Sequence, residues 1–210
     1  MRHLSADSDW AQLISEVGRP RLEVARRQSP YEALMRAIAH QQLHGQAARA
    51  ITARFLALYG GFPEPAQVLA TPEAMLRACG FSATKVACLR EISARALDGT
   101  IPSRAAAARL TDERLIERLT TIRGVGRWTV EMLLIFTLGR KDVLPVDDFG
   151  VREGYRVLKR LDAQPRPKAL AEIGAAWAPY RSVAAWYLWR AAHRGRQSAA
   201  QPEGARILAA

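Results

Sequence analysis

The sequence has only two cysteines, Cys79 and Cys88, among 210 residues. Neither has partners at the spacing of metal ligands, so a disulfide framework, a zinc site and a four-cysteine iron–sulfur cluster are unsupported. The first residues, MRHLSADSDW, are too polar for a signal peptide, and no apolar run approaches the roughly 20 residues that a membrane-spanning helix needs. We therefore expect a protein of the reducing cytoplasm with no membrane partner.

Acidic residues are scarce relative to basic ones. The chain has 20 Asp and Glu against 31 Lys and Arg, which gives a net charge of +11. Such an excess favours a polyanionic partner such as nucleic acid, although unrelated proteins of a basic proteome share the bias. Hydrophobic residues make up 49% of the chain, enough for one sizeable core or for two small lobes that share a cleft.

No segment alternates between apolar and polar residues with a period of two, so the expected fold class is all-α. From Tyr31 to Leu58 apolar residues recur every three or four positions, which predicts one buried helix that begins after Pro30 and ends at Gly60 and Gly61. Further helices are expected at about 72–79, 83–98, 111–121, 127–138, 148–160, 167–177 and 179–194. Residues 99–108 are expected to be a loop with a turn of helix.

We expect residues 1–194 to form a single unit of two lobes, with a ligand cleft between the lobes. The middle lobe covers about 42–140 and contains a hairpin at 119–128, and the second lobe joins about 1–41 to 141–194. Residues 195–210 are rich in Gln, Ala and Gly and are expected to be a flexible tail.

The segment 119–130, LTTIRGVGRWTV, has the form of a helix, a glycine hairpin and a second helix. Gly124 and Gly126 permit a tight turn and a close approach of the backbone to a partner, and the N–H groups that open the next helix suit a phosphate. Arg123 and Arg127 flank the turn, so the hairpin could grip one DNA strand without reading its sequence. An ordinary helical hairpin with a glycine turn is the alternative, which the basic pair and the net charge make less favoured.

Two acids follow the hairpin in the segment 143–150, VLPVDDFG. Asp147 is well placed to cap the next helix, and Asp148 would then lie in its first turn, where the helix dipole keeps a carboxylate ionised. Considered alone, both residues are more commonly helix-start acids than catalytic groups.

Three segments in order resemble the helix-hairpin-helix DNA glycosylases, and among these the 3-methyladenine DNA glycosylase II (AlkA-type) enzymes. The segments are AIAHQQLHGQAARAITARFLALYG, GVGRWTVEMLLIFTLGRKDVLPVDDFGV and WAPYRSVAAWYLWR, and the similarity covers roughly residues 30–194. The resemblance implies an all-helical, two-lobed glycosylase with a cleft, in a compact form without the N-terminal β-rich domain of many AlkA-type relatives. It also implies a monomer that acts in the nucleoid or its equivalent.

The function implied by the resemblance is excision of alkylated bases, of the 3-methyladenine and 7-methylguanine type, from double-stranded DNA in the first step of base excision repair. Asp148 would be the catalytic carboxylate that faces the deoxyribose, and Asp147 would orient it, although the sequence alone does not separate the two. A carboxylate can stabilise the positive charge that develops on the sugar, and a cationic alkylated purine leaves without being protonated. Bifunctional relatives carry a lysine where this chain has Trp128, so we expect hydrolysis without lyase activity.

A cationic base stacks favourably on aromatic faces. By match to the subfamily, Trp128, Phe149 and Trp189 are expected to line the base pocket, with Met132 where some relatives have a tyrosine. Core packing is the alternative for each aromatic residue, and for Trp189 the two readings are equally supported.

The segment 40–44, HQQLH, interrupts an apolar helical pattern with four polar residues in five. An enzyme that extrudes a base must fill the gap left in the duplex, and the relatives place their intercalating residue here. We expect Gln42, or else Leu43, to be this wedge, and His44 to border the pocket mouth. A solvated helix surface is the alternative.

No cofactor is expected, except that relatives hold a monovalent cation, Na⁺ or K⁺, on hairpin carbonyls that correspond to Thr120, Ile122 and Val125. Two other function classes compete with the glycosylase: a non-catalytic helix-hairpin-helix DNA-binding protein and a helical protein-interaction scaffold. The presence of Asp148 together with Trp128 and Trp189 favours the enzyme over the first, and a scaffold would require neither the basic hairpin nor the polar segment QQLH.

Overall fold

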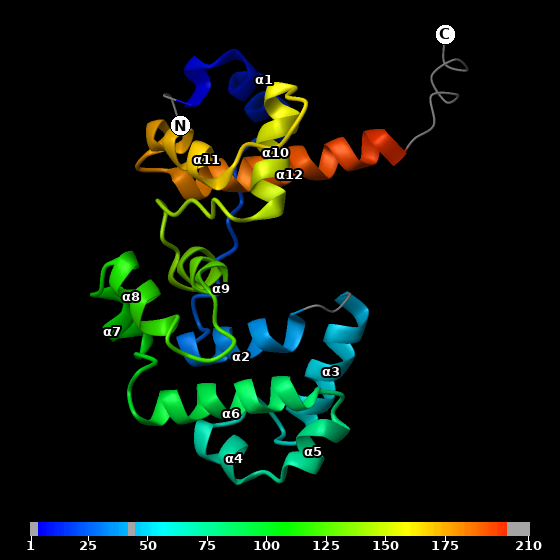
Figure 1. Cartoon of the computed structure of the whole chain (residues 1–210), viewed down its shortest axis with the longest axis vertical. Coiled ribbons are helices and arrows are strands. Elements are labelled where there is room, and N and C mark those ends of the chain that lie inside the picture. The colour runs from blue at the N-terminus through cyan, green and yellow to red at the C-terminus, as the bar shows by residue number, and fades with distance from the viewer. Residues whose placement is uncertain (1–3, 42–44, 201–210) are drawn as a thin grey trace. The chain divides into compact units, whose positions relative to one another are not determined.

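The computed structural model describes residues 4–41 and 45–200, and every regular element within these ranges is a helix (Figure 1). The expected all-α class is confirmed. The chain divides into two compact units, which we call the terminal unit (Met1–Glu23 with Arg140–Ala210) and the middle unit (Val24–Gly139). Among the described helices, none combines the length and the apolar character that a membrane span requires.

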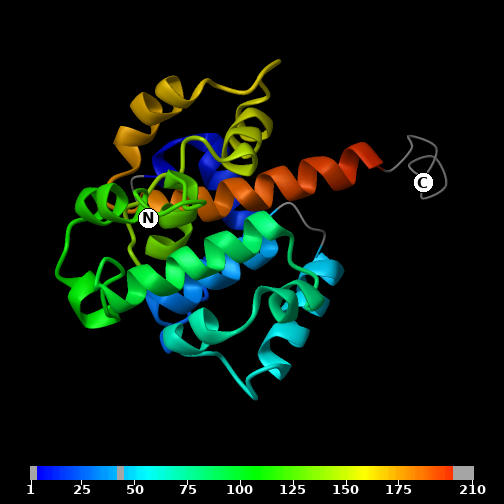
Figure 2. The same ribbon diagram turned by 60° about the horizontal axis from the view of Figure 1, so that its bottom comes forward.

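The middle unit begins with α2, whereas the sequence analysis placed the start of this lobe near residue 42. Its helices are α2 (Pro30–His40), α3 (Gly45–Ala57), α4 (Pro65–Ala70), α5 (Glu73–Ala78), α6 (Ala83–Leu97), α7 (Arg104–Ala108), α8 (Asp112–Leu119), α9 (Arg127–Met132) and the π-helix η2 (Leu133–Leu138). The helix α2 packs against α6, α9 and η2, and it lies beside α6 in both views (Figure 1, Figure 2). Burial of Leu34 and Ile38 ties α2 to this unit.

The single helix expected over residues 31–58 is wrong, because the chain forms two helices, α2 and α3, in this range. The Ser29 hydroxyl caps α2 by accepting from the Glu32 N–H, and Pro30 occupies the first turn, where its missing N–H costs nothing. Gln41 then adopts ψ 133°, which ends the helix at the polar segment that breaks the apolar pattern. Gly139 ends η2 in the left-handed conformation at φ 74°.

The terminal unit contains η1 (Leu4–Ala6), α1 (Ser8–Val17), α10 (Phe149–Lys159), α11 (Pro167–Gly174), η3 (Ala175–Trp177) and α12 (Arg181–Ala200). Its core includes Trp10, Trp177 and Tyr187. The helix α12 continues to Ala200, so the part of the expected tail at 195–200 is helical, and the remainder of that tail lies outside the described residues. The helix α1 was not anticipated from the sequence.

The helices α10 and α12 cross in direct backbone contact. A Cβ added at Gly154 would come within 1.9 Å of the Leu188 carbonyl oxygen, so only glycine permits this crossing. The contact matters for the site described below, because the start of α10 carries Asp148 and α12 carries Trp189.

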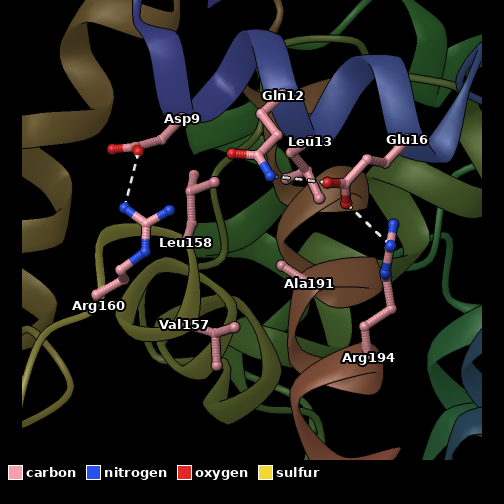
Figure 3. A pocket seen from close by; sticks show the side chains of 9 residues that line it. All are labelled: Asp9, Gln12, Leu13, Glu16, Val157, Leu158, Arg160, Ala191 and Arg194. Atoms are coloured by element: carbon pink, nitrogen blue, oxygen red, sulfur yellow. Dashed lines mark hydrogen bonds and ion pairs between the residues drawn. The ribbon is translucent and has the colours of Figure 1, made fainter. Parts of the chain in front are cut away.

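Charge pairs hold α1 to these two helices (Figure 3). Glu16 on α1 pairs with Arg194 on α12 at 2.9 Å, and Asp9 pairs with Arg160 at 3.4 Å. The pairs border a small cavity of about 150 Å³ whose apolar lining includes Leu13. Since the charges at its rim are already paired, we interpret this cavity as a packing feature of the three-helix junction.

Candidate active site and nucleic-acid interface

The glycine hairpin joins α8 to α9 in the middle unit. Ile122 and Val125 are buried and anchor the turn, and the Val125 N–H donates to the Ile122 carbonyl at 3.0 Å. Gly126 is the N-cap residue of α9 and has no side chain to satisfy the N–H groups that open the helix. Those groups are suited to an anionic oxygen, as the sequence analysis expected.

Gly124 is required by two independent features of the turn. Its φ of 83° lies in the left-handed region, and an added Cβ would come within 2.6 Å of the Cys88 sulfur on α6. The buried sulfur therefore packs directly behind the turn, and the hairpin backbone lies close against α6.

The two arginines that flank the turn are both exposed. Arg127 donates from Nε to the Glu131 carboxylate at 3.0 Å, and the Glu131 side chain is almost fully buried whereas the Arg127 side chain is 57% exposed. The ion pair therefore fixes the guanidinium beside α9 while much of the side chain stays exposed to solvent. Arg123 adds a second positive charge to the same turn.

The end of α2 meets the hairpin. Gln41 donates from its side-chain amide to the Gly124 carbonyl at 3.2 Å, and Lys85 donates to the carbonyls of Ala39 and Gln41 at 3.0 and 2.8 Å. Burial lowers the pKa of the Lys85 ammonium. The residues expected to act as wedge and pocket mouth, Gln42, Leu43 and His44, lie outside the described residues.

The hairpin carbonyls expected to bind a monovalent cation belong to Thr120, Ile122 and Val125. Neutral carbonyl oxygens are hard donors that suit such an ion, and the bond from Val125 N–H uses only one of the two lone pairs of the Ile122 oxygen. The donor chemistry of these residues therefore fits the ion, and the cation site stays a prediction.

Asp148 is the N-cap residue of α10, with φ −67° and ψ 122°. Its Oδ1 accepts from the Val151 N–H at 2.8 Å and from the Trp189 indole N–H at 2.8 Å. The expectation that Asp147 caps the helix and that Asp148 lies in the first turn is wrong. The helix begins at Phe149, so the capping position falls on Asp148, and Asp147 is an exposed residue before it.

Gly150 makes the contact between Asp148 and Trp189 possible. An added Cβ would lie 2.8 Å from Trp189 Cδ1 and 3.1 Å from Asp148 Oδ1. Neither this glycine contact nor the indole bond is predicted by the sequence. The only sequence signal is a glycine two positions after the acid, which has no meaning until the partner on α12 is known.

Two of the three aromatic residues that are expected to face a base are exposed. Trp128 on α9 is 45% exposed and Phe149 at the start of α10 is 60% exposed, so core packing does not explain either residue. Trp189 is half-buried, packs against the core of the terminal unit and also bonds to Asp148. Met132 at the end of α9 is half-buried.

Residues 35–179 match the HhH-GPD superfamily of base excision DNA repair proteins. The chain belongs to this superfamily. The match spans both the hairpin and Asp148, the two features that the sequence analysis used to recognise the helix-hairpin-helix glycosylases.

Relatives of this HhH-GPD protein carry 3-methyladenine glycosylase names. DNA-3-methyladenine glycosylase 1 from Schizosaccharomyces pombe is 47% identical over 193 residues, which cover 90% of this chain and 84% of the relative. A similar solved structure is that of the Schizosaccharomyces pombe 3-methyladenine DNA glycosylase Mag1 in complex with abasic DNA, with a TM-score of 0.81. The two sequences are 47% identical, and the similarity covers 90% of this chain and 94% of that chain. The expected fold and family are confirmed.

A bacterial structure is also similar to this HhH-GPD protein. The DNA-3-methyladenine glycosidase from Bacillus halodurans gives a TM-score of 0.84 at 34% identity and covers 93% of this chain and 90% of that chain. Since both units of the chain are included at this coverage, the similarity is not confined to the hairpin.

The structure brings the predicted site residues together in two groups. In the terminal unit Asp148, Phe149 and Trp189 are neighbours at the start of α10. In the middle unit the hairpin and the first turns of α9 carry Arg123, Gly124, Val125, Gly126, Arg127, Trp128 and Met132.

Proposed function

We propose that this HhH-GPD protein is a monofunctional DNA glycosylase that hydrolyses the N-glycosidic bond of alkylated bases in double-stranded DNA. The observation that carries the proposal is the fixed carboxylate of Asp148, held at the start of α10 by the Val151 N–H and the Trp189 indole. The names of the similar proteins, which are 3-methyladenine glycosylases, support it.

The chemistry follows from the charge that develops on the sugar. As the bond to the base breaks, the deoxyribose becomes positively charged, and a preorganised carboxylate beside it stabilises that charge or orients the attacking water. Asp148 is suited to this role because its two hydrogen bonds fix the carboxylate before substrate arrives. A base alkylated on a ring nitrogen is already cationic, so it departs with the bonding electrons and needs no second acid.

Base recognition rests on exposed aromatic faces. Trp128 and Phe149 present large ring surfaces to solvent, and an electron-poor, cationic base stacks on such surfaces more strongly than a normal base. We propose that this preference selects alkylated purines, and that Trp189 of the terminal unit and, from the middle unit, His44 and the half-buried Met132 also contribute to base recognition.

DNA binding uses the hairpin and its arginines. The N–H groups at the start of α9, where Gly126 provides no capping side chain, and the charges of Arg123 and Arg127 suit phosphates of one strand, which gives affinity without sequence preference. We propose that the protein binds as a monomer, with Gln42 or Leu43 filling the gap left by the extruded base and with Na⁺ or K⁺ on the hairpin carbonyls.

The absence of lyase activity is proposed from one position. A Schiff base requires a lysine amine close to the sugar, and this chain has Trp128 where bifunctional relatives carry that lysine. Borohydride reduction of the enzyme during turnover on lesion-containing DNA should therefore trap no covalent complex. A trapped complex would contradict the monofunctional assignment.

The deciding experiment measures release of 7-methylguanine and 3-methyladenine from methylated duplex DNA by purified protein. We expect release by the wild type, and a loss of about 100-fold or more in the Asp148→Asn variant, because the amide keeps both hydrogen bonds but not the charge. The Asp147→Asn variant is the matched control and should retain activity. No release by the wild type would leave the non-catalytic DNA-binding alternative, and undiminished release by Asp148→Asn would reject the catalytic assignment.

A further inference from the structure

A lysine from α6 holds the last turn of α2. Lys85 donates from Nζ to the carbonyl oxygens of Ala39 and Gln41, at 3.0 and 2.8 Å. The final carbonyls of a helix lack partners within the helix, and a positive charge there also complements the negative end of the helix dipole. Lys85 thus acts on α2 as a C-terminal cap supplied by another helix.

The position of Lys85 in its own helix argues against a local role. It lies in the first turn of α6, after the capping residue Ser82, where a positive charge is unfavourable for the dipole of α6 itself. Its burial lowers the pKa of the ammonium, so holding the charge there has a cost. A lysine needed only for solubility would extend its ammonium into water. The contact with α2 is therefore what the side chain contributes.

The same region of α6 also supports the hairpin. Cys88 follows Lys85 by three residues, which places the two on one face of the helix, and its sulfur packs behind Gly124. Gln41 closes the arrangement, because its backbone carbonyl accepts from Lys85 while its side-chain amide donates to the Gly124 carbonyl. One turn of α6 thereby joins the end of α2 to the hairpin backbone.

We propose that Lys85 is a positioning residue for base extrusion, which acts through Gln41 to hold the end of α2 and the hairpin as one rigid DNA-contacting surface. The inference rests on the proposed function, since it takes the hairpin to be the surface that grips the duplex. Extrusion of a base costs a few kcal/mol of stacking and pairing, and that cost is offset only if the gripping elements keep their spacing. Loss of Lys85 should therefore impair extrusion more than bond cleavage.

The test compares a paired and an unpaired lesion under single-turnover conditions. In Lys85→Met, which keeps the length and the apolar stem, excision of 7-methylguanine opposite cytosine should slow about tenfold or more. With the same lesion opposite an abasic-site analogue, where little pairing has to be broken, the loss should stay below about threefold. Equal slowing on both substrates, or no slowing on either, would overturn the proposal.

Two matched variants separate positioning from charge. Lys85→Arg keeps a positively charged donor on a side chain of similar reach, although the guanidinium is larger than the ammonium, and should restore part of the rate on the paired substrate. Lys168→Met removes the same charge from an exposed residue of α11 and should leave the ratio between the two substrates unchanged. If Lys168→Met also slowed excision on the paired substrate more than on the unpaired one, net charge would be responsible, and the role of Lys85 would be rejected.

A second variant protects the test against failure of Lys85→Met to fold. Gln41→Ala breaks the link to Gly124 from a half-buried side chain and should show the same selective defect. Because both residues act through one connection, the double variant should be no slower than the more affected single variant. Additive losses would contradict a shared connection.

A fluorescence readout does not depend on excision. A 2-aminopurine paired with thymine in the duplex brightens when the bound protein unstacks it. We expect brightening with the wild type and Lys168→Met, and about tenfold more Lys85→Met protein to be needed for the same signal. If the wild type brightens the probe but releases no base, the proposed function is rejected and the inference about Lys85 is not. Equal titration curves for wild type and Lys85→Met, or no brightening by the wild type, would reject the inference.

Discussion

The indole N–H of Trp189 donates to Oδ1 of Asp148 at 2.8 Å, on the same oxygen that accepts the Val151 N–H at 2.8 Å. One bond comes from the helix that Asp148 caps and the other from α12, which crosses α10 in backbone contact at Gly154. The carboxylate is therefore oriented by two helices at once. This arrangement assigns Trp189 a role besides stacking on the base.

Replacing Trp189 by phenylalanine should separate the two roles, because the variant keeps an aromatic face and loses the N–H. A hydrogen bond to a charged group contributes about 1.5–3 kcal/mol, so we expect the single-turnover rate to fall about tenfold or more. Affinity for DNA with an abasic-site analogue should change little. The Trp186→Phe variant, on the same helix, is the ring-matched control. An unchanged rate in Trp189→Phe would show that the bond does not orient the carboxylate for catalysis.

Gly150→Ala should disturb the same contact through sterics alone. A Cβ at this position would lie 2.8 Å from Trp189 Cδ1, so the indole must shift away from Asp148. Alanine is otherwise favoured over glycine inside a helix by about 1 kcal/mol, which partly offsets the clash in the free energy of unfolding. We expect a loss of activity of about tenfold with a change in unfolding free energy of less than about 2 kcal/mol.

The control for this substitution is Gly61→Ala. Its added Cβ meets nothing within 4 Å and its backbone is not in the left-handed region, so both activity and stability should be retained. Full activity in Gly150→Ala, measured beside this control, would refute the steric argument.

The elements that the sequence predicted well are those with a local signal. The hairpin was evident from two glycines beside apolar anchors, and α10 from the acids before it, because capping and turn formation involve neighbouring residues. The break between α2 and α3 was missed, since the apolar period continues across it and only the polar segment 40–44 marks it. That this segment supplies the intercalating wedge residue stays a prediction.

The contacts that the sequence could not predict join distant residues. Asp148 and Trp189 are 41 positions apart, and nothing local indicates that the indole points to the carboxylate. The same holds for Lys85 and the end of α2, 44 positions away. Asp148 rather than Asp147 is the cap because α10 begins at Phe149. Sequence patterns locate the start of a helix only to within a few residues, so they do not separate two adjacent acids.

Acidification should release the contact that anchors α12. Arg181 donates to both carboxylate oxygens of Asp142 at 2.8 and 2.9 Å, and these bonds hold the pKa of Asp142 below its usual value of 3.8. A lowered pKa stabilises the fold at any pH above 3.8, and this contribution disappears as the pH falls through the folded-state pKa. Since about a third of each side chain is exposed, the contribution is about 1 kcal/mol or less.

The measurement is urea unfolding of the wild type and Asp142→Asn at pH 7 and at pH 3. The variant should be less stable at pH 7, and the difference between the two proteins should shrink at pH 3. Asp162→Asn, which alters an exposed acid of the same unit, should show no such convergence. A difference that stays constant between the two pH values would contradict the assignment to this carboxylate.

The two hairpin glycines should respond differently to alanine. At Gly124 the positive φ and the Cys88 sulfur at 2.6 Å both oppose a Cβ, so we expect a loss of about 1–3 kcal/mol in unfolding free energy along with weaker DNA binding. At Gly126 φ is −90° and the added Cβ meets nothing within 4 Å of the protein, so the fold should tolerate alanine.

The proposed DNA contact adds a cost at Gly126 that the fold alone does not show. A methyl group there would stand where the phosphate backbone approaches the start of α9, so Gly126→Ala should bind a duplex several-fold more weakly at unchanged stability. Fluorescence anisotropy across salt concentrations, combined with thermal unfolding, measures both quantities. If Gly126→Ala binds DNA as the wild type does, the backbone of this turn is not the phosphate contact. The Arg123 and Arg127 side chains would then have to account for the grip, and their substitution by glutamine should reduce the salt dependence of binding.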